Sequence, residues 1–288
     1  MELLVLAAST IAIGVFGCIA WFWGSNFLLD TILPAKGPRA GDNIRRANVI
    51  RPWLFLGPAI LFLGVYLVYP VINSLWLSMN DAGSRNFVGL RNYRWLGGDP
   101  KFRESMVNNF LWLLIVPALS TAFGLVAAQL TDRIRWGNFG KSLIFMPMAI
   151  SFVGAGVIWK FIYEYREPGT EQIGLLNAIV QGLGGTAQTW LTLQPWNSFF
   201  LMVVLIWIQT GFAMVILSAA IRGIPEETIE AAVLDGANPW QIFFRIKVPQ
   251  IMGTIAVVWT TITITVLKVF DIVFVMTNGQ WGTQVLAN

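Results

Sequence analysis

The sequence predicts an all-α polytopic membrane protein, a bundle of apolar helices joined by short hydrated connections. Of its 288 residues, 56% are hydrophobic and only 12% are charged, about half of the charged fraction that is usual in soluble domains. The charged residues also leave long uncharged intervals, each of at least the length that lets a helix cross a bilayer, about 17–25 residues. These intervals are 3–29, 52–80, 105–131, 142–159, 172–221 and 248–267. Their distribution excludes a soluble fold of one or two domains.

The first apolar stretch is expected to be a retained membrane helix. A cleaved signal peptide has a basic start, an apolar core of about 7–15 residues and a small-residue cleavage site. Here Glu2 is acidic, the apolar run continues from Leu3 to Trp23, and no Ala-x-Ala site closes it. Residues 1–49 are therefore assigned to an extra N-terminal membrane helix and a basic cytoplasmic linker.

The rest of the chain, residues 50–288, is expected to form one helical core. Its membrane helices are expected at about residues 52–78, 106–130, 142–163, 196–220 and 251–275, with a cytoplasmic loop at 221–250. Pro58, Pro117 and Pro147 fall inside these spans, and kinks are expected there because neighbouring helices can satisfy the carbonyls that a proline frees. Residues 172–196 contain several glycines and lack helical periodicity, which indicates an outer loop.

The basic residues predict the orientation of these spans. Eleven of the nineteen fall in three loops that six spans place on one side, namely 34–51, 131–141 and 221–250. Seven lie in loops of the other side, and Lys268 lies within a span. Because basic loops stay preferentially in the cytoplasm, the first three loops are assigned to the inside and the N-terminus to the outside. The net charge of +4 has the same explanation, so the expected partner is the lipid bilayer and no nucleic acid is expected.

The composition excludes several chemistries. The chain has no histidine, so it lacks an imidazole base, a Ser-His-Asp triad and a histidine metal site. Cys18 is the only cysteine, which excludes an internal disulfide and a Cys-x-x-Cys pair. The Walker-like trace at residues 140–142 lacks the glycine that the motif requires at Arg135, and no strand precedes it, so it is a chance match. We therefore expect no catalytic residue, metal or cofactor in this chain.

The loop at residues 221–250, called the signature loop below, carries the strongest functional signal. Between Arg222 and Lys247 it holds seven ionisable groups. Placing them at the centre of a membrane would cost on the order of 20 kcal/mol, at about 3 kcal/mol each. The loop is therefore expected to lie in water or against a protein.

Within the signature loop the residues predict two short helices. Pro225 suits a first helical position, the two glutamates that follow it suit a first turn, and Gly236 suits a C-terminal stop. Asn238 is the expected N-cap of the second helix, and Pro249 is expected to mark its end.

The signature loop resembles that of the permeases of binding-protein-dependent ABC importers. Their signature reads Glu-Ala-Ala, three residues, Gly, nine residues, Ile, one residue, Leu-Pro. The matching residues here are Glu230, Ala231, Ala232, Gly236, Ile246 and Pro249, with Val248 in place of the leucine. The match lies between two spans, on the side that the charge bias assigns to the cytoplasm.

Further segments resemble carbohydrate permeases of the maltose and α-glucoside type. The similar segments are residues 51–59, 69–70, 87–93, 270–272 and 277–279. Two features depart from the family pattern. Gly279-Gln280-Trp281 stands where the family usually has Gly-Gly-Pro, and the family has one more spanning helix after this loop. The type I importer permease fold is therefore expected here with its last core helix missing.

The resemblance implies a permease subunit of an ATP-driven sugar importer in the bacterial cytoplasmic (inner) membrane, without catalysis of its own. A cytoplasmic ABC ATPase dimer would bind ATP and Mg²⁺, and its closure would switch the permeases between inward-open and outward-open states. A second permease subunit and an extracytoplasmic sugar-binding protein would complete the system. The expected coupling residues are Glu230, Ala231, Ala232 and Gly236, with the small residues allowing close docking and the glutamate making a polar contact.

The family resemblance also places a substrate path among the spans at 142–163, 196–220 and 251–275. The expected path residues are Ser151, Trp207, Gln209, Phe212, Thr265 and Lys268. Their amides, hydroxyls and rings suit a sugar, which offers hydroxyl groups and a ring face. Structural roles stay open for the same residues: serine and threonine often bond helix carbonyls, aromatics pack, and Lys268 can snorkel or pair with Asp271.

Other functions stay open at this stage. A permease of the same family could carry another solute. A secondary transporter would need acidic residues at the midplane and often an inverted repeat, whereas only Asp271, near a span end, is a candidate. A membrane-embedded enzyme would need a polar catalytic cluster within the spans, and none is visible.

Overall fold

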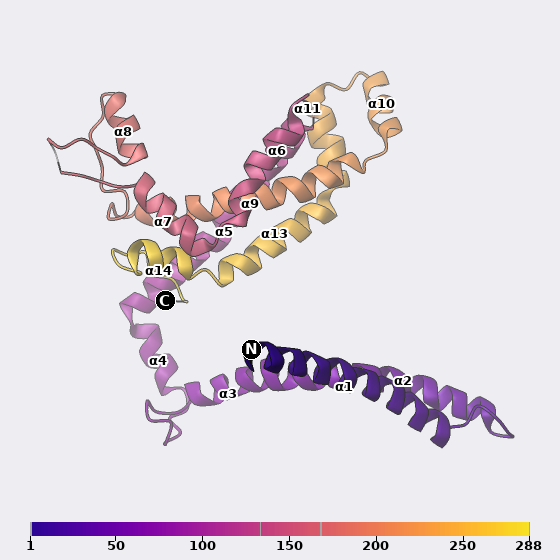
Figure 1. Cartoon of the computed structure of the whole chain (residues 1–288). Helices are drawn as coiled ribbons and strands as arrows, with labels where there is room; N and C mark the ends of the chain where they lie inside the picture. Colours follow the sequence, from indigo (N-terminus) through magenta and orange to yellow (C-terminus); the bar gives the residue numbers. More distant parts are fainter. Residues whose placement is uncertain (1, 133, 168, 288) are drawn as a thin grey trace. The chain divides into compact units, whose positions relative to one another are not determined.

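The computed structural model describes residues 2–132, 134–167 and 169–287. These residues form helices joined by turns and loops, with one isolated β-bridge between Asn80 and Phe87 (Figure 1), so the all-α prediction is confirmed. The chain divides into two compact units, Met1–Arg94 and Trp95–Asn288. Four of the described helices are long and apolar enough to cross a membrane, or up to six if each bent helix pair is counted as one span.

Two long helical runs make up most of the first unit, followed by the segment that holds the β-bridge and the start of α4 (Arg91–Gly98). The two runs are α1 (Glu2–Ile32) and a continuous helical run of α2 (Ala40–Leu63), the π-helical η1 (Gly64–Val68) and α3 (Tyr69–Ser78). The Trp21 indole N–H donates to the Leu54 carbonyl at 2.9 Å, and Arg51 pairs with Asp30 at 2.8 Å. The most apolar window of each helix has no buried residue. These surfaces suit lipid, in which apolar side chains need no protein cover.

Two π-helical segments each precede a proline. In η1 the Tyr69 N–H bonds the Gly64 carbonyl, and Pro70 follows directly. The π-helical η3 (Ile242–Lys247) ends in the same way, with the Val248 N–H bonding the Phe243 carbonyl ahead of Pro249. A proline ring clashes with the carbonyl four residues earlier. The wider π turn moves that carbonyl and keeps the helical run intact.

The second unit contains the remaining helices, beyond α4 (Arg91–Gly98), which spans the unit boundary. They are α5 (Pro100–Thr131), α6 (Gly137–Phe145), η2 (Met146–Ala149), α7 (Phe152–Ile162), α8 (Leu175–Gly182), α9 (Asn197–Arg222), α10 (Glu226–Leu234), α11 (Pro239–Gln241), η3, α12 (Val248–Gln250), α13 (Met252–Leu267) and α14 (Asp271–Thr277). Its core lies where α5, α9 and α13 pack together, with Trp112, Met214 and Ile262 fully buried.

Small residues allow α9 to pack closely against both α5 and α6. A Cβ atom added to Gly124 on α5 would lie 2.4 Å from the Cβ of Ala213 on α9. A Cβ added to Gly211 would lie 2.6 Å from the Ile144 carbonyl oxygen of α6. Small residues at such contacts let helix backbones approach closely, which is the main source of packing energy between helices in lipid.

The helix expected at 142–163 is broken in the structure, and the one expected at 251–275 is divided into α13 and α14 by residues 268–270. The pair formed by α6 with η2 and α7 bends by 106°, and Pro147 lies in η2 at the bend. A second bend lies between the end of the signature loop and α13, where the run from α11 to α12 meets α13 at 69°. Pro58 and Pro117, by contrast, lie inside α2 and α5 without ending them. Residues 172–196 contain the short helix α8, which the sequence did not predict.

Gly124→Ala is expected to lower the thermal unfolding midpoint of the detergent-solubilised protein. The added Cβ would clash with Ala213 and with the backbone of Met214, and overpacking of this kind costs about 1–3 kcal/mol. Size-exclusion chromatography after graded heating measures the midpoint. Gly57→Ala is the matched control, because a Cβ there meets nothing within 4 Å. Equal midpoints for the two variants would contradict the packing argument.

Candidate functional site

The first helix of the signature loop ends in a Schellman motif built on Gly236. This residue has φ +79°, a left-handed conformation that glycine adopts without strain. Its N–H bonds the Val233 carbonyl at 3.0 Å, and the Ala237 N–H bonds the Ala232 carbonyl at 2.9 Å. These are the two hydrogen bonds of the motif. Gly236 therefore sets the direction of the chain between α10 and α11.

The second helix starts with a capping box. The Asn238 side chain accepts from the Gln241 N–H at 2.9 Å, and the Gln241 side chain accepts from the Asn238 N–H at 2.8 Å. Pro239 occupies the first turn. These bonds satisfy backbone donors that a helix start leaves free, so the connection between the helices is fixed by local bonds.

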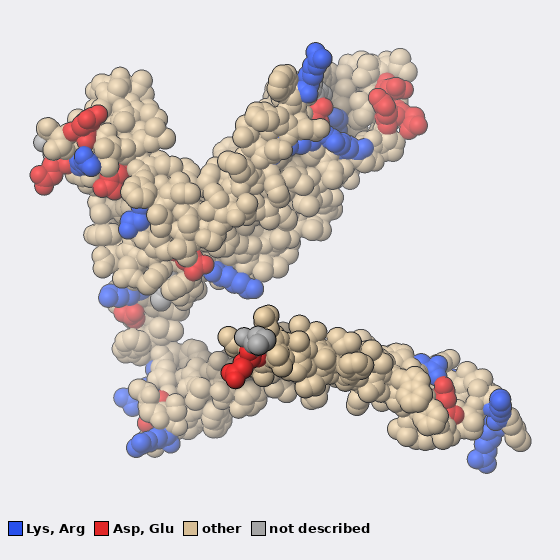
Figure 2. Space-filling view, in the orientation of Figure 1, with Lys and Arg blue, Asp and Glu red and all other residues tan. Residues whose placement is uncertain are grey.

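The three expected coupling residues of α10 differ in their exposure. Glu230 and Ala231 are exposed, whereas Ala232 is buried against the rest of the chain. The sequence analysis did not single out Leu234, which is 88% exposed at the end of α10. Figure 2 shows acidic side chains grouped on α10, in agreement with the glutamates of its first turn. The helix thus presents acidic, small and apolar groups outward.

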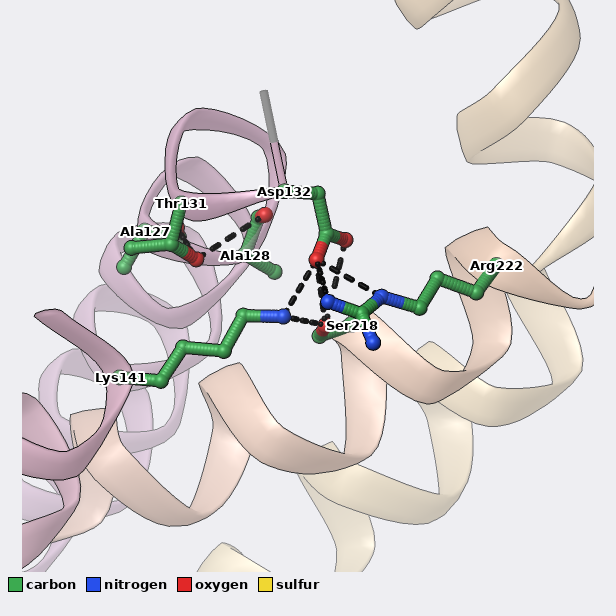
Figure 3. A network of polar contacts seen from close by, with 7 residues as sticks. All are labelled: Ala127, Ala128, Thr131, Asp132, Lys141, Ser218 and Arg222. Atoms are coloured by element: carbon green, nitrogen blue, oxygen red, sulfur yellow. Dashed lines mark hydrogen bonds and ion pairs between the residues drawn. The ribbon is translucent and has the colours of Figure 1, made fainter. Parts of the chain in front are cut away.

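A polar cluster lies at the base of the signature loop (Figure 3). The Asp132 carboxylate, directly after α5, accepts hydrogen bonds from Lys141 of α6 and from Ser218 and Arg222 of α9. The distance is 3.1 Å from Ser218 Oγ to either Asp132 oxygen and 2.8 Å in the ion pair with Arg222 Nη2. The Asp132 and Lys141 side chains are only 14% and 15% exposed. We call these four residues the Asp132 cluster.

Close packing brings the members of the Asp132 cluster together. A Cβ atom on Gly137, the first residue of α6, would lie 1.9 Å from the Thr131 carbonyl oxygen. Only glycine therefore lets α6 start directly against the end of α5, which places Lys141 one turn later beside Asp132. Arg222 is the last residue of α9, four positions before α10 begins. The cluster thus joins the ends of three helices where the signature loop emerges.

The electrostatics of the cluster favour an ionised Asp132. Burial acts to raise the pKa of its carboxyl group, but hydrogen bonds from Lys141, Arg222 and Ser218 more than offset burial and hold the pKa below its ordinary value. This site was not predicted from the sequence, in which Lys141 counted only as a basic residue of the loop at 131–141 and as part of the chance match at 140–142. A usable signal was present, since Asp132 is the only acidic residue between 131 and 141 and directly follows a span.

The six expected path residues belong to three helices: one caps α7, three lie on α9 and two lie at the end of α13. Ser151 is the N-cap of α7 and accepts from the Gly154 N–H at 3.1 Å, while the Thr265 hydroxyl donates to the Thr261 carbonyl of its own helix. Gln209 is buried on α9, and Trp207 of the same helix contacts Trp159 of α7 edge to face, with ring centroids 5.8 Å apart.

Phe212 is partly buried on α9, and Lys268 is exposed at the end of α13. In the part of the chain that the structure describes, no ion pair joins Lys268 to Asp271. Nor does any hydrogen bond or ring contact there join two of the six residues. Their role in a substrate path stays a prediction.

The segment after α14, which departs from the family pattern, is held by asparagines. The Asn108 side-chain amide of α5 donates to the carbonyls of Gly282 and Gln284, both at 2.8 Å. Asn197 of α9 donates to the Trp281 carbonyl at 2.6 Å. Gln280 and Trp281 therefore belong to a loop fixed against the ends of α5 and α9 that lie opposite the signature loop.

Within residues 2–132, 134–167 and 169–287, no group of three or more cysteine or acidic side chains is arranged to hold a metal ion. The polar groups described above bond to one another or to backbone, which suits positioning of helices.

Comparison with known proteins supports a transport function. Residues 120–286, more than half of the chain, match the family described as binding-protein-dependent transport system inner membrane component. The alpha-glucoside transport system permease protein AglF of Rhizobium meliloti (strain 1021) is 70% identical over 291 residues, which cover 100% of this chain and 87% of that protein. The osmoprotective compounds uptake permease protein GgtC of Synechocystis is 54% identical over 235 residues, covering 82% of this chain and 84% of that protein.

Solved structures show the same fold. A bacterial ABC transporter involved in the import of the acidic polysaccharide alginate contains a chain with a TM-score of 0.70 and 21% identity, covering 86% of this chain and 85% of that one. The alginate transporter in complex with an alginate pentasaccharide-bound periplasmic protein gives a TM-score of 0.68 at 21% identity, covering 85% and 82%. The predicted permease fold is thereby confirmed.

Asp132→Asn is expected to destabilise the protein at pH 7 but not at low pH. Because the pKa of Asp132 is lower in the folded chain than in the unfolded chain, the ionised carboxylate stabilises the fold at every pH above the ordinary carboxyl pKa of 3.8. This contribution is lost as the pH falls through the lowered pKa. The difference in unfolding midpoint between wild type and variant should be constant from about pH 7 to pH 5 and shrink below about pH 4.

Asp235→Asn is the control for this measurement. Asp235 is exposed, and its replacement should leave the midpoint unchanged at every pH. A deficit of Asp132→Asn that persists unchanged at low pH would mean that the charge of Asp132 does not stabilise the fold.

Proposed function

The chain belongs to the family of binding-protein-dependent transport system inner membrane components, and we propose that it is the permease subunit through which an α-glucoside or maltose-like sugar enters the cell. The substrate class rests on one observation: this chain is, over its whole length, 70% identical to a protein described as an alpha-glucoside permease. The described helices that are long enough to cross a membrane agree with this role. The proposed location is the bacterial cytoplasmic (inner) membrane.

The chain is a transport subunit, and the energy source in this proposal is a partner. A cytoplasmic ATPase dimer binds ATP and Mg²⁺, and its movement reaches this chain through α10. Exposed Glu230 supplies a charged contact, and exposed Ala231 and Leu234 supply small and apolar surface for a cleft. A second permease and an extracytoplasmic sugar-binding protein complete the system.

The Asp132 cluster transmits this movement in the proposal. Because only residues 223–225 separate α10 from Arg222, displacement of α10 pulls on the end of α9. The carboxylate of Asp132 ties that end to α5 and, through Lys141, to α6. The three helices therefore move together, as rigid-body switching between two open states requires.

A second candidate substrate class follows from one observation. The relative described as an uptake permease for osmoprotective compounds is 54% identical over most of the chain. A small osmoprotective solute is therefore the alternative cargo for the same mechanism.

Cells that lack other sugar importers and express the complete system are expected to take up labelled maltose, trehalose or sucrose, with unlabelled α-glucosides competing. Gln209→Ala or Lys268→Leu should reduce this uptake about tenfold or more with assembly intact, as loss of a path contact predicts. Uptake of an osmoprotectant but no α-glucoside would favour the second candidate. Unchanged uptake in both variants would remove these two residues from the path.

Variants of Gly236 test the coupling role of the signature loop. Gly236→Val is expected to abolish most uptake, because a β-branched residue is strained at φ +79°. Gly236→Asn tolerates this conformation better, and the Cβ position has no neighbour within 4 Å in this chain. If uptake falls in both while ATPase subunits still copurify, a partner requires the small surface of the glycine. Full uptake and full ATPase stimulation in Gly236→Val would contradict the coupling role.

A further inference from the structure

We infer that a pocket at the end of α9 opposite the signature loop is a sugar subsite the size of one hexose ring. This inference rests on the proposed function and adds a site to it. The pocket is formed by Lys160 and residues 163–165, at and after the end of α7, and by residues 189–192, which precede α9. We call it the aromatic pocket, since Tyr163, Tyr165 and Trp190 line it.

The walls of the aromatic pocket are held by one buried side chain. Asn177 of α8 is fully buried, and its amide donates to the carbonyls of Glu164 at 2.9 Å and of Gln188 at 3.1 Å. Its oxygen accepts from the Trp190 indole N–H at 2.9 Å. The Tyr163 hydroxyl is bonded to the Phe200 carbonyl at 3.0 Å. Asn177 thus links the two segments of the pocket, and the polar ends of both rings are fixed within the protein.

Three polar side chains at the rim of the aromatic pocket have no bonding partner among the described residues. Across the described parts of the chain, the side chains of Lys160, Glu164 and Tyr165 make no hydrogen bond or ion pair, although all three line the pocket. Lys160 and Glu164 are four residues apart and still do not pair. The pocket therefore combines a fixed aromatic wall with an ammonium, a carboxylate and a phenol that are free to bond a ligand.

This chemistry fits a pyranose. One face of a sugar ring carries C–H groups that pack on an aromatic ring, while its hydroxyls donate to a carboxylate and accept from an ammonium or phenol. The cavity volume is about 210 Å³, below the range of about 300–1,000 Å³ that is usual for drug-sized ligands. The volume limits the occupant to about one ring of an oligosaccharide.

A chain of rings connects the aromatic pocket to the predicted path. Centroid distances are 5.1 Å between Trp190 and Phe200, 5.6 Å between Phe200 and Tyr163, and 5.3 Å between Tyr163 and Trp159. Trp159 then contacts Trp207, a predicted path residue, at 5.8 Å. The aromatic pocket thus lies at one end of a row of contacting rings, and Trp207 of α9 lies at the other end. This position suits the first binding of a sugar.

The experiment uses the complete complex in lipid nanodiscs without the sugar-binding protein, with maltose as the probe. Saturation-transfer NMR is expected to detect maltose on the wild-type complex, with signals at least fivefold weaker in Glu164→Gln and Tyr165→Ala. Glu167→Gln is the matched control, because Glu167 is an exposed carboxylate of the same loop that does not line the pocket. Maximal maltose uptake in cells should fall about tenfold in the first two variants and stay normal in the control.

The outcomes separate a sugar subsite from a protein contact and from failure of the proposed function. Equal maltose signals in wild type, Glu164→Gln and Tyr165→Ala would overturn the subsite. The subsite would also be overturned if Glu164→Gln and Tyr165→Ala weakened docking of the sugar-free binding protein as much as they weakened the maltose signal. This surface would then be a protein contact. Wild-type uptake of maltose with unimpaired uptake in both variants rejects the subsite alone. Failure of the wild-type system to take up any α-glucoside rejects the proposed function together with a sugar as the occupant.

Discussion

Close contact between α5 and α9, fixed by polar groups at both ends, is the constraint on which the second unit depends. In lipid, apolar side chains gain little by leaving their surroundings, so helices associate through close packing and hydrogen bonds. Gly124 opposite Ala213 supplies the close packing. At one end Asp132 ties both helices to α6, and at the other Asn108 and Asn197 hold the loop after α14. The two helices can therefore shift as a pair but cannot easily slide past each other.

This arrangement gives the signature loop a mechanical meaning. A helix that docks on a moving partner transmits force only if its attachment is stiff. The Schellman motif at Gly236 and the capping box at Asn238 fix the loop locally, and Arg222 joins it to the Asp132 cluster. The ionised state of Asp132 matters here, because a charged acceptor binds its donors about twice as strongly as a neutral one. The negative charge of Asp132 therefore contributes to the rigidity of the base of the signature loop.

The opposite end of the unit has a different character. There the fixed groups are aromatic rings and asparagine amides, and the free groups are charged or hydroxylic. Such a surface suits reversible binding of a ligand, since its walls need no rearrangement and its rim offers several weak hydrogen bonds. The broken helix pair of α6 and α7 brings this surface next to α9. In the proposed function, one unit thereby carries both the attachment for an ATPase and a preformed surface for the sugar.

The sequence by itself determined the helical class, the position of the long apolar helices and the two helices of the signature loop, because these depend on local composition, prolines, caps and one left-handed glycine. It could not reveal that Asp132 meets Ser218 and Arg222, which are 86 and 90 positions away from it, nor that Asn177 joins two segments of a loop. Only the tertiary structure decided these contacts, because packing of glycine against backbone brings distant residues within hydrogen-bonding distance, and no local pattern in the chain records which helices approach that closely.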